Sequence, residues 1–342
     1  MRLLVTGGCG FIGSNFIRRR LTGTDDSIVN LDALTYAANP GNLADIAGGD
    51  RYRFVEGRVE DAVAVNAALT GVDAAVHFAA ESHVDRSIAD AAPFITTNVL
   101  GTQVLLDGVR HAGVARFVHV STDEVYGALG AEGVFTESTP FRPRSPYAAS
   151  KAAGDMLAQA AYETWHLPVS IVRPSNNYGP YQFPEKFIPV MVTNLVEGRK
   201  IPIYGRGENV RDWLYVEDCC QAIDLVLERG RPGEAYNVGG ASERRNIEVA
   251  RMVIGEMGRG EESIEYVPDR PGHDFRYALD NAKISRELGW KPATRFEDGL
   301  NRTVAWYREH PEWWRPLLAR LDRAAQGFWT GHDRPGGKRA AP

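Results

Sequence analysis

The sequence predicts an α/β fold: a doubly wound parallel sheet with a smaller C-terminal α/β lobe. Two observations predict it. In the first half of the chain, short apolar runs alternate with helical patterns, which is typical of a parallel sheet with helices on both faces. After about Asn177, turn-rich stretches such as NNYGPYQFPEK and YGRGENVRD separate shorter elements, which indicates a second lobe.

Six apolar runs are the expected strands, and they cover Leu3–Thr6, Ile28–Leu31, Arg53–Val55, Ala74–Phe78, Ala115–Ser121 and Val169–Val172. Helical patterns are found at Phe11–Leu21, Phe94–Ala112 and Ser145–Trp165, and a last one at about 296–310. We therefore expect a first lobe over 1–175 and a second lobe over 176–320, interleaved with the first. A tail over 321–342 is Gly-, Pro- and charge-rich toward its end and is expected to be disordered there.

Composition excludes several classes of protein. The 342 residues carry 39 basic and 44 acidic side chains, and this net charge of −5 offers no basic face for a nucleic acid. No run of about 18 apolar residues predicts a membrane span, and the opening MRLLVTGG lacks the apolar run of a signal peptide. The three cysteines have the spacing of neither a disulfide framework nor a zinc site. We expect a cytoplasmic protein with no metal, nucleic-acid or membrane partner.

A glycine-rich turn, TGGCGFIG, follows the first strand and opens the first helix. Gly7, Gly10 and Gly13 allow the tight turn, the close approach of a pyrophosphate and the packing of helix on strand in a Rossmann-like fold. Asp32 ends the second strand 19 residues beyond Gly13, where a carboxylate accepts hydrogen bonds from an adenosine ribose. It would repel a 2′-phosphate, which favours NAD over NADP. The competing interpretation is an ordinary turn with a solvated aspartate.

Tyr147 and Lys151 lie four residues apart in SPYAASK and therefore share one face of a helix. An ammonium beside a phenol favours the phenolate and is expected to lower its pKa. Such a tyrosine can take a proton from a hydroxyl while hydride leaves the same carbon. Alone, the spacing also fits an exposed helix face; behind the glycine motif, catalysis is the favoured interpretation.

Two adjacent carboxylates, Asp123 and Glu124, follow the strand that ends at Ser121. The carboxyl ends of strands are where a doubly wound sheet places its ligands. Once C4 of a hexose is a ketone, the C5–H is acidic: one carboxylate can remove that proton while the other, protonated, assists loss of the C6 hydroxyl. The pattern does not say which carboxylate does which, and a loop acid with a helix cap is the competing interpretation.

Together these motifs resemble the extended short-chain dehydrogenase/reductase family and, within it, the dTDP-glucose 4,6-dehydratases. The matching stretches run from residue 2 to about 310, and the most discriminating are STDEVYG, SNNYGPYQFPEK and DRPGHDFRY. The resemblance implies conversion of dTDP-glucose to dTDP-4-keto-6-deoxy-glucose with NAD. It also implies a homodimer, paired through the helices at Phe94–Ala112 and Ser145–Trp165.

The resemblance also implies roles. Tyr147 is the base at the C4 hydroxyl and Lys151 tunes it; Thr122 binds the C4 oxygen, Asp123 is the acid and Glu124 the base at C5. Cofactor contacts are implied at Gly7, Gly10, Phe11, Ile12, Gly13, Asp32, Ala33, Leu34, Thr35, Arg58, Val59, Phe78, Ala79, Ala80, Ser82, Thr97, Tyr147, Lys151 and Asn177. Substrate contacts are implied at Ser82, Thr122, Asn176, Lys186, Phe187, Pro202, Ile203, Tyr204, Arg211, Asn246, Asp269, Arg270, Pro271, Gly272 and His273.

One position departs from the family pattern. Arg58 stands where the family usually has an acidic residue that contacts the adenine amino group, and an arginine cannot accept that bond. The alternatives to the dehydratase are a UDP-hexose 4-epimerase, a UDP-glucose 4,6-dehydratase or, from another class, a non-catalytic NAD-sensing protein. An epimerase has no need of the Asp123–Glu124 pair, and a sensor has no need of Tyr147 and Lys151.

Overall fold

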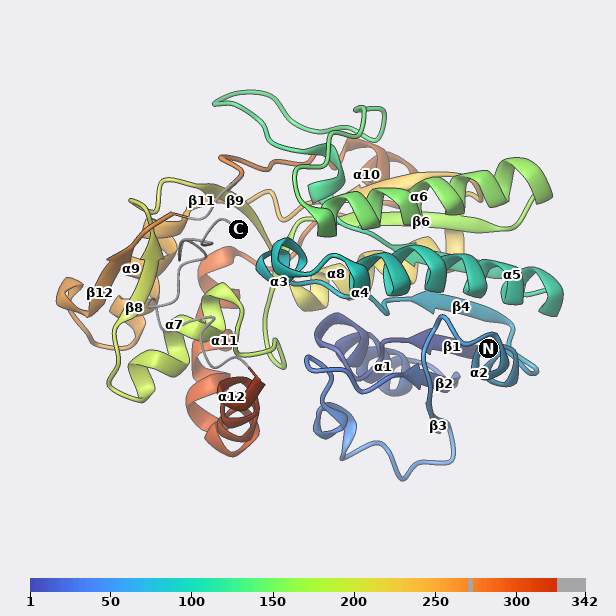
Figure 1. The fold of residues 1–342 in the computed structure, drawn as a ribbon, viewed down its shortest axis with the longest axis horizontal. Coiled ribbons are helices and arrows are strands. Elements are labelled where there is room, and N and C mark those ends of the chain that lie inside the picture. The colour runs from blue at the N-terminus through green and yellow to red at the C-terminus, as the bar shows by residue number, and fades with distance from the viewer. Residues whose placement is uncertain (270–272, 325–342) are drawn as a thin grey trace, which may run out of the picture.

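A computed structural model of the chain describes residues 1–269 and 273–324. Its centre is a sheet of seven parallel strands in the order β10-β6-β5-β4-β1-β2-β3 (Figure 1). The strands are β1 (Arg2–Thr6), β2 (Ser27–Asp32), β3 (Tyr52–Glu56), β4 (Ala74–His77), β5 (Arg116–Val120), β6 (Val169–Pro174) and β10 (Ala235–Val238). The strand order reverses between β1 and β4, where Thr6 is in register with both Leu31 and His77. Such a switch point opens a crevice at the carboxyl ends of the strands.

Helices cover both faces of this sheet, as the alternating pattern predicts. On one face, apolar side chains of the sheet pack with α1 (Phe11–Gly23), α8 (Val216–Arg229) and α10 (Ala282–Leu288). On the other face they pack with α2 (Ala62–Ala68), α5 (Thr102–Ala112) and α6 (Pro146–Trp165). The α/β, Rossmann-like fold class predicted from the sequence is confirmed.

The predicted helix over 94–112 is three consecutive helical segments. α4 (Ala92–Phe94) leads into a π-helical stretch, Ile95–Gly101, before α5. In the π-helical stretch, Asn98 accepts from the Glu81 amide and donates to the Glu81 carbonyl, both at 2.9 Å, and also donates to Ser150 Oγ. π-Helical turns are frequent at functional sites, and this one ties α6 to the loop after β4.

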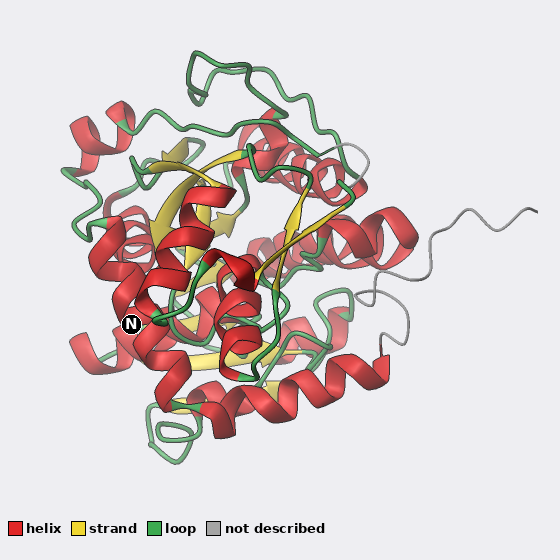
Figure 2. Cartoon of the chain, turned by 90° about the vertical axis from the view of Figure 1, so that its left-hand side faces the viewer, coloured by secondary structure: helices red, strands yellow, loops and turns green. Residues whose placement is uncertain are grey.

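The smaller lobe contains two small sheets with helices packed around them (Figure 2). Its elements are β7 (Asn176–Tyr178), β9 (Val210–Tyr215) and β11 (Glu243–Arg245) in one sheet, β8 (Ile201–Tyr204) and β12 (Ile264–Val267) in the other, and α7 (Phe187–Val196), α9 (Asn246–Glu256), α11 (Phe296–Glu309) and α12 (Pro311–Ala324). α8 and β10 lie between these elements in sequence but pack in the first lobe, so the chain passes back and forth between the lobes. The division at residue 175 stays a prediction.

The helix α12 lies where the sequence analysis predicted the end of the second lobe, up to residue 320, and the first residues of a tail. Pro311 begins the helix, a position that tolerates proline, and Pro316 lies inside it. The rest of the predicted tail, from residue 325, lies outside the described residues. No helix in the described part of the chain is long and apolar enough to cross a membrane, and the same residues contain no cluster of acidic, His and Cys side chains able to hold a metal ion.

Candidate active site

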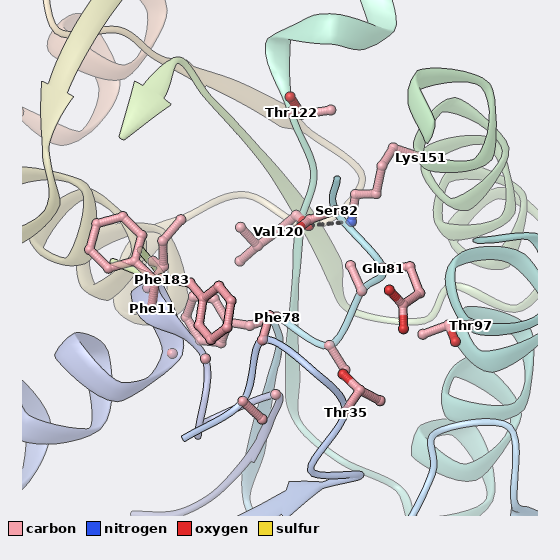
Figure 3. Close-up of a pocket in the computed structure, with 18 of the residues that line it drawn as sticks. Phe11, Thr35, Phe78, Glu81, Ser82, Thr97, Val120, Thr122, Lys151 and Phe183 are labelled. Atoms are coloured by element: carbon pink, nitrogen blue, oxygen red, sulfur yellow. Dashed lines mark hydrogen bonds between the residues drawn. The ribbon is translucent and has the colours of Figure 1, made fainter. Parts of the chain in front are cut away.

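A cavity of about 320 Å³ opens at the carboxyl ends of β1, β2, β4, β5 and β6 (Figure 3). Its wall contains every residue predicted to contact the cofactor except Leu34. It also contains all five predicted catalytic residues, Thr122, Asp123, Glu124, Tyr147 and Lys151. Residues as far apart in the sequence as Gly7 and Lys186 therefore meet in one cavity.

The glycine-rich turn has no room for side chains. Gly7 has a φ of +72°, and a Cβ there would lie 2.6 Å from the Ala79 nitrogen. A Cβ on Gly13 would lie 2.4 Å from the Gly7 carbonyl oxygen. Gly10 precedes α1 and has no side chain that could cap the helix. The first residues of α1 line the cavity, so their backbone N–H groups are available to a ligand there. A turn of this shape leaves a cradle that fits a pyrophosphate.

Asp32 is held in position at the end of β2. Its carboxylate accepts from the amides of Cys9 and Leu34, both at 2.8 Å. Leu34 has a left-handed φ of 49° and lies outside the cavity wall, so it acts here through its amide on Asp32. Arg58 is on the wall, half-exposed and ion-paired with Glu60.

The wall also presents buried oxygens that lack hydrogen-bond partners within the described chain. They include Asp123 Oδ2, Asn176 Oδ1, Asn177 Oδ1 and Gln182 Oε1. A buried polar atom without a partner is costly, so such atoms mark where a polar ligand would bind. The glycine cradle and these acceptors fit a dinucleotide in the same cavity as a second polar ligand.

Tyr147 and Lys151 lie on the first turns of α6. Ser145 begins this helix by accepting from the Ala148 amide at 3.1 Å, and Pro146 occupies its first position. Both side chains are buried, and Lys151 Nζ donates to the Val120 carbonyl at 2.7 Å (Figure 3). Burial lowers the pKa of Lys151 to about 8, opposed by the charge of Asp155.

The pKa of Tyr147 differs from the expectation. The sequence analysis expected the lysine to lower it, but burial first, and then the charge of Glu124, raises the pKa of the phenol above its usual value. The reason is geometric. The Lys151 ammonium donates to the Val120 carbonyl, and the carboxylates of Glu124 and Asp123 act on the phenol. A cationic ligand near Tyr147 would oppose this shift.

Asp123 and Glu124 form a short 3₁₀ turn, Asp123–Tyr126, immediately after β5. Thr122 Oγ1 caps the turn, accepts from the Glu124 amide and lies 3.3 Å from Asp123 Oδ1. Burial, and after it the charges of Glu124 and Asp212, raise the pKa of Asp123 well above its usual value. A raised pKa favours the protonated form of Asp123, which is the form that a proton donor needs.

A buried polar network supports the catalytic helix from behind. Arg173 on β6 donates from Nε to Asp155 at 2.7 Å and from Nη1 to the Tyr126 hydroxyl at 2.8 Å. Although burial would raise it, Arg173 and His119 lower the pKa of Asp155 to about 2. This network joins α6, β5, β6 and the turn that holds the carboxylate pair.

The predicted substrate residues fall into two groups. Ser82, Thr122, Asn176 and Lys186 line the cavity, and Lys186 Nζ donates to the Ser82 carbonyl at 3.4 Å. The others that the structure describes lie outside the cavity wall: Phe187, Pro202, Ile203, Tyr204, Arg211, Asn246, Asp269 and His273. Arg270, Pro271 and Gly272 lie outside the described residues.

Two of these residues are buried in the described structure. Ile203 is fully buried in the core of the second lobe, on β8. Arg211 is also buried; Nη1 donates to the Val210 carbonyl at 2.7 Å and Nη2 to the Asp274 carbonyl at 3.0 Å, and its charge acts on Asp123 of the cavity wall. The predicted substrate contacts of both residues stay predictions.

Sequence reasoning missed Gln182 and Phe183, which line the cavity. Glu81 also lines it and burial raises its pKa, but it lies in the stretch from Phe78 to Ser82, after β4, where the sequence places cofactor contacts and where the strand-end signal applies. Phe183 could not have been found in this way, because it comes from a loop whose path depends on the second lobe.

Comparison with known proteins places this geometry in a family. A protein-family model described as GDP-mannose 4,6 dehydratase matches residues 4–303. A dTDP-glucose 4,6-dehydratase of Streptomyces niveus is 52% identical over 322 residues, which are 93% of this chain and 96% of that protein. One from Shigella flexneri is 48% identical over 340 residues, which are 92% of this chain and 94% of that protein.

Solved structures show the same relationship. The dTDP-glucose 4,6-dehydratase DesIV from Streptomyces venezuelae, crystallised with NAD and TYD bound, has a TM-score of 0.91 and 54% identity over 93% of this chain and all of that one. The UDP-glucose 4-epimerase of Thermus thermophilus has a TM-score of 0.83 and only 30% identity, over 91% of this chain and all of that one. With about half of its residues identical over nearly its whole length, this chain belongs to the dTDP-glucose 4,6-dehydratase family.

Proposed function

We propose that this protein is a hydro-lyase that converts dTDP-glucose to dTDP-4-keto-6-deoxy-glucose and water, with NAD as its resident cofactor. The observation that carries the proposal is the pair of Glu124 and the buried Asp123, whose pKa is raised, in the cavity that also contains Tyr147 and Lys151. Oxidation at C4 alone requires only the tyrosine and the lysine. A second acid–base pair is needed when water is eliminated.

The cofactor site fits NAD. The glycine cradle at Gly7, Gly10 and Gly13 suits the pyrophosphate, and Asp32 suits an adenosine ribose without a 2′-phosphate. Phe11, Ile12, Phe78 and Thr97 complete the wall on that side. When bound, NAD accepts the hydride that leaves C4 and later returns it to C6.

The side chains then carry the protons. Tyr147 removes the proton of the C4 hydroxyl, and Thr122 donates a hydrogen bond to that oxygen. Glu124 takes the proton from C5, while Asp123 donates its proton to the C6 hydroxyl, which leaves as water. After hydride reaches C6, C5 regains a proton. Oxidation at C4 and reduction at C6 balance, so the net change is the loss of one water.

A direct test is incubation of the purified protein with dTDP-glucose and, in parallel, with UDP-glucose. The proposal expects a 4-keto-6-deoxy product from dTDP-glucose, detected by chromatography and mass spectrometry as the loss of one water. A sugar nucleotide of unchanged mass but inverted C4 would favour the epimerase. The two substrates differ by the methyl group of thymine and by the 2′-hydroxyl of the UDP ribose; recognition of the methyl group alone should favour dTDP-glucose by roughly 10- to 200-fold.

We also infer that two copies pair through the outer face of α5, the π-helical stretch and α6. Leu100, Met156 and Trp165 are 52%, 59% and 45% exposed there, a set of large apolar side chains that a second copy would cover. A Met156→Glu variant should shift the protein toward the monomer in light scattering after size exclusion. A wild-type monomer would contradict the pairing.

A cytoplasmic location is part of the proposal. It is supported by Cys9, Cys219 and Cys220, which are buried free thiols. Cell fractionation with an antibody to the protein tests it, and recovery from the membrane fraction would contradict it.

A further inference from the structure

α12 contacts the loop that carries the predicted cofactor residues after β2. The family model matches only residues 4–303, so this helix lies beyond it. In Figure 1 α12 lies beside α11, at the edge of the second lobe that faces the first lobe. Its partner is the segment from Ala33 to Leu43, of which Ala33, Thr35, Ala37 and Ala38 line the cavity.

Arg320 binds this segment through its main chain. Nη2 donates to the carbonyl oxygens of Tyr36 at 2.6 Å and of Ala38 at 2.9 Å. The guanidinium carbon also lies 5.7 Å from the ring centre of Phe183, which is itself on the cavity wall. One cation thus holds two carbonyls on either side of Ala37.

Trp313 contacts the same loop about two helical turns before Arg320 and connects the loop to the glycine-rich turn. Its indole donates to Asn42 Oδ1 at 2.9 Å. Asn42 Nδ2 in turn donates to the Cys9 carbonyl at 3.0 Å, and the Asn39 amide donates to that same oxygen at 2.9 Å. The chain of contacts ends inside the turn that fits a pyrophosphate.

Apolar packing completes the contact. Leu317 and Leu321 are buried against Phe183, with Tyr36 and Ala37 at the edge of the same cluster. The contact between α12 and the loop therefore spans Trp313 to Leu321.

We propose that α12 is a brace that closes the cofactor loop and slows the release of NAD, with Arg320 as its main positioning residue. This rests on the proposed function, in which the cofactor ends each turnover as it began and benefits from staying bound. For a dinucleotide to leave, the loop from Ala33 to Asn42 must move away from the glycine turn. That movement would break the bonds of Arg320 and Trp313 together.

The test measures how fast NAD leaves the loaded full-length protein after rapid dilution, with released NAD determined enzymatically. Arg320→Met keeps an unbranched apolar side chain near Phe183 and removes the donors, so release should become about tenfold faster. Arg320→Lys, which keeps a charged donor, should release NAD at a rate between those of the wild type and Arg320→Met. Trp313→Phe, which removes only the donor of the indole and part of its ring, should also release NAD faster.

Arg315→Met is the matched control. Arg315 lies on the same helix, is 59% exposed and pairs with Glu197, away from the cofactor loop. It should leave the release rate at the wild-type value. If Arg320 had only a structural role, Arg320→Met would lower the melting temperature of the NAD-free and of the NAD-loaded protein by the same amount. The brace predicts instead that NAD raises the melting temperature of Arg320→Met by less than it raises that of the wild type.

Wild-type release from Arg320→Met would overturn the brace while leaving the proposed function intact. A wild-type protein that binds no NAD would overturn the proposed function, and the brace with it.

Discussion

Lys151 donates a hydrogen bond from Nζ to the main-chain carbonyl of Val120 at 2.7 Å. This bond fastens α6 to the last residue of β5, two residues before Thr122. The phenol of Tyr147 is carried by the helix and the two carboxylates by the turn after the strand. Their relative position thus depends on one buried lysine as well as on the general packing of helix on sheet.

Tyr147→Phe removes the proton acceptor at C4 and changes little else in the buried wall. We expect kcat to fall by about 10²- to 10⁴-fold, because general base catalysis contributes about that much. NAD binding, measured by calorimetry, should stay near the wild-type value. A variant that turns over normally would show that another group removes the proton.

Removal of each of the two carboxylates should block the reaction at a different step. Glu124→Gln removes the base at C5, so exchange of the C5 hydrogen with deuterated water should be lost together with the product. Asp123→Asn removes the proton donor for the leaving hydroxyl, so C5 exchange should continue while water is not eliminated. Mass spectrometry of recovered sugar nucleotide distinguishes the two, and the reverse pattern would exchange their roles.

Asp212 is expected to tune the acid. Burial raises its own pKa to about 6, so it is charged at neutral pH, and its charge helps to raise the pKa of Asp123. In Asp212→Asn the pKa of Asp123 should fall, so the acid loses its proton at lower pH. The alkaline limb of the kcat/KM profile should therefore move to lower pH.

Asp218→Asn is the control for that shift. Asp218 is also buried and accepts from two backbone amides, those of Ala293 and Thr294, but it is not among the groups that shift Asp123. Asp218→Asn should leave the alkaline limb of the kcat/KM profile at the same pH as in the wild type. An Asp212→Asn profile identical to that of the wild type would contradict the coupling.

The glycine cradle gives a steric prediction. In Gly13→Ala the new methyl group would lie 2.4 Å from a main-chain oxygen that cannot yield without opening the turn. NAD affinity should drop by about tenfold or more, since such overpacking costs about 1–3 kcal/mol. Gly23→Ala, at the end of the same helix and with no atom within 4 Å of the new Cβ, should bind NAD normally.

The sequence predicted the elements whose pattern is local. The six strand runs, the glycine turn and the Tyr147–Lys151 pair can each be recognised in a few consecutive residues. In the structure the runs form strands β1 to β6, the turn precedes α1 and the pair lies on α6. The carboxylate pair was located from its pattern, but its division of roles came only from the family resemblance, because the pattern shows neither the burial of Asp123 nor the charge of Asp212, about ninety residues away.

What the sequence could not predict depends on contacts between distant segments. The π-helical stretch at Ile95–Gly101 coincides with the bonds of Asn98 to Glu81 and Ser150. α12 was missed because Pro316 inside it argues against a helix, and because its apolar side chains find partners in Phe183, in the loop after β2 and in the core of the second lobe. The hydrogen bonds of Arg211 to the carbonyl oxygens of Val210 and Asp274 were equally out of reach of the sequence.

The central claim is an oxidation at C4 followed by reduction at C6 within one substrate molecule, and dTDP-glucose carrying deuterium at C4 tests it most directly. The protein, incubated without added NAD, should release dTDP-4-keto-6-deoxy-glucose with that deuterium at C6. Product without deuterium at C6, a 4-epimer that keeps its C6 hydroxyl, or no product while another dehydratase converts the same substrate in parallel would contradict it.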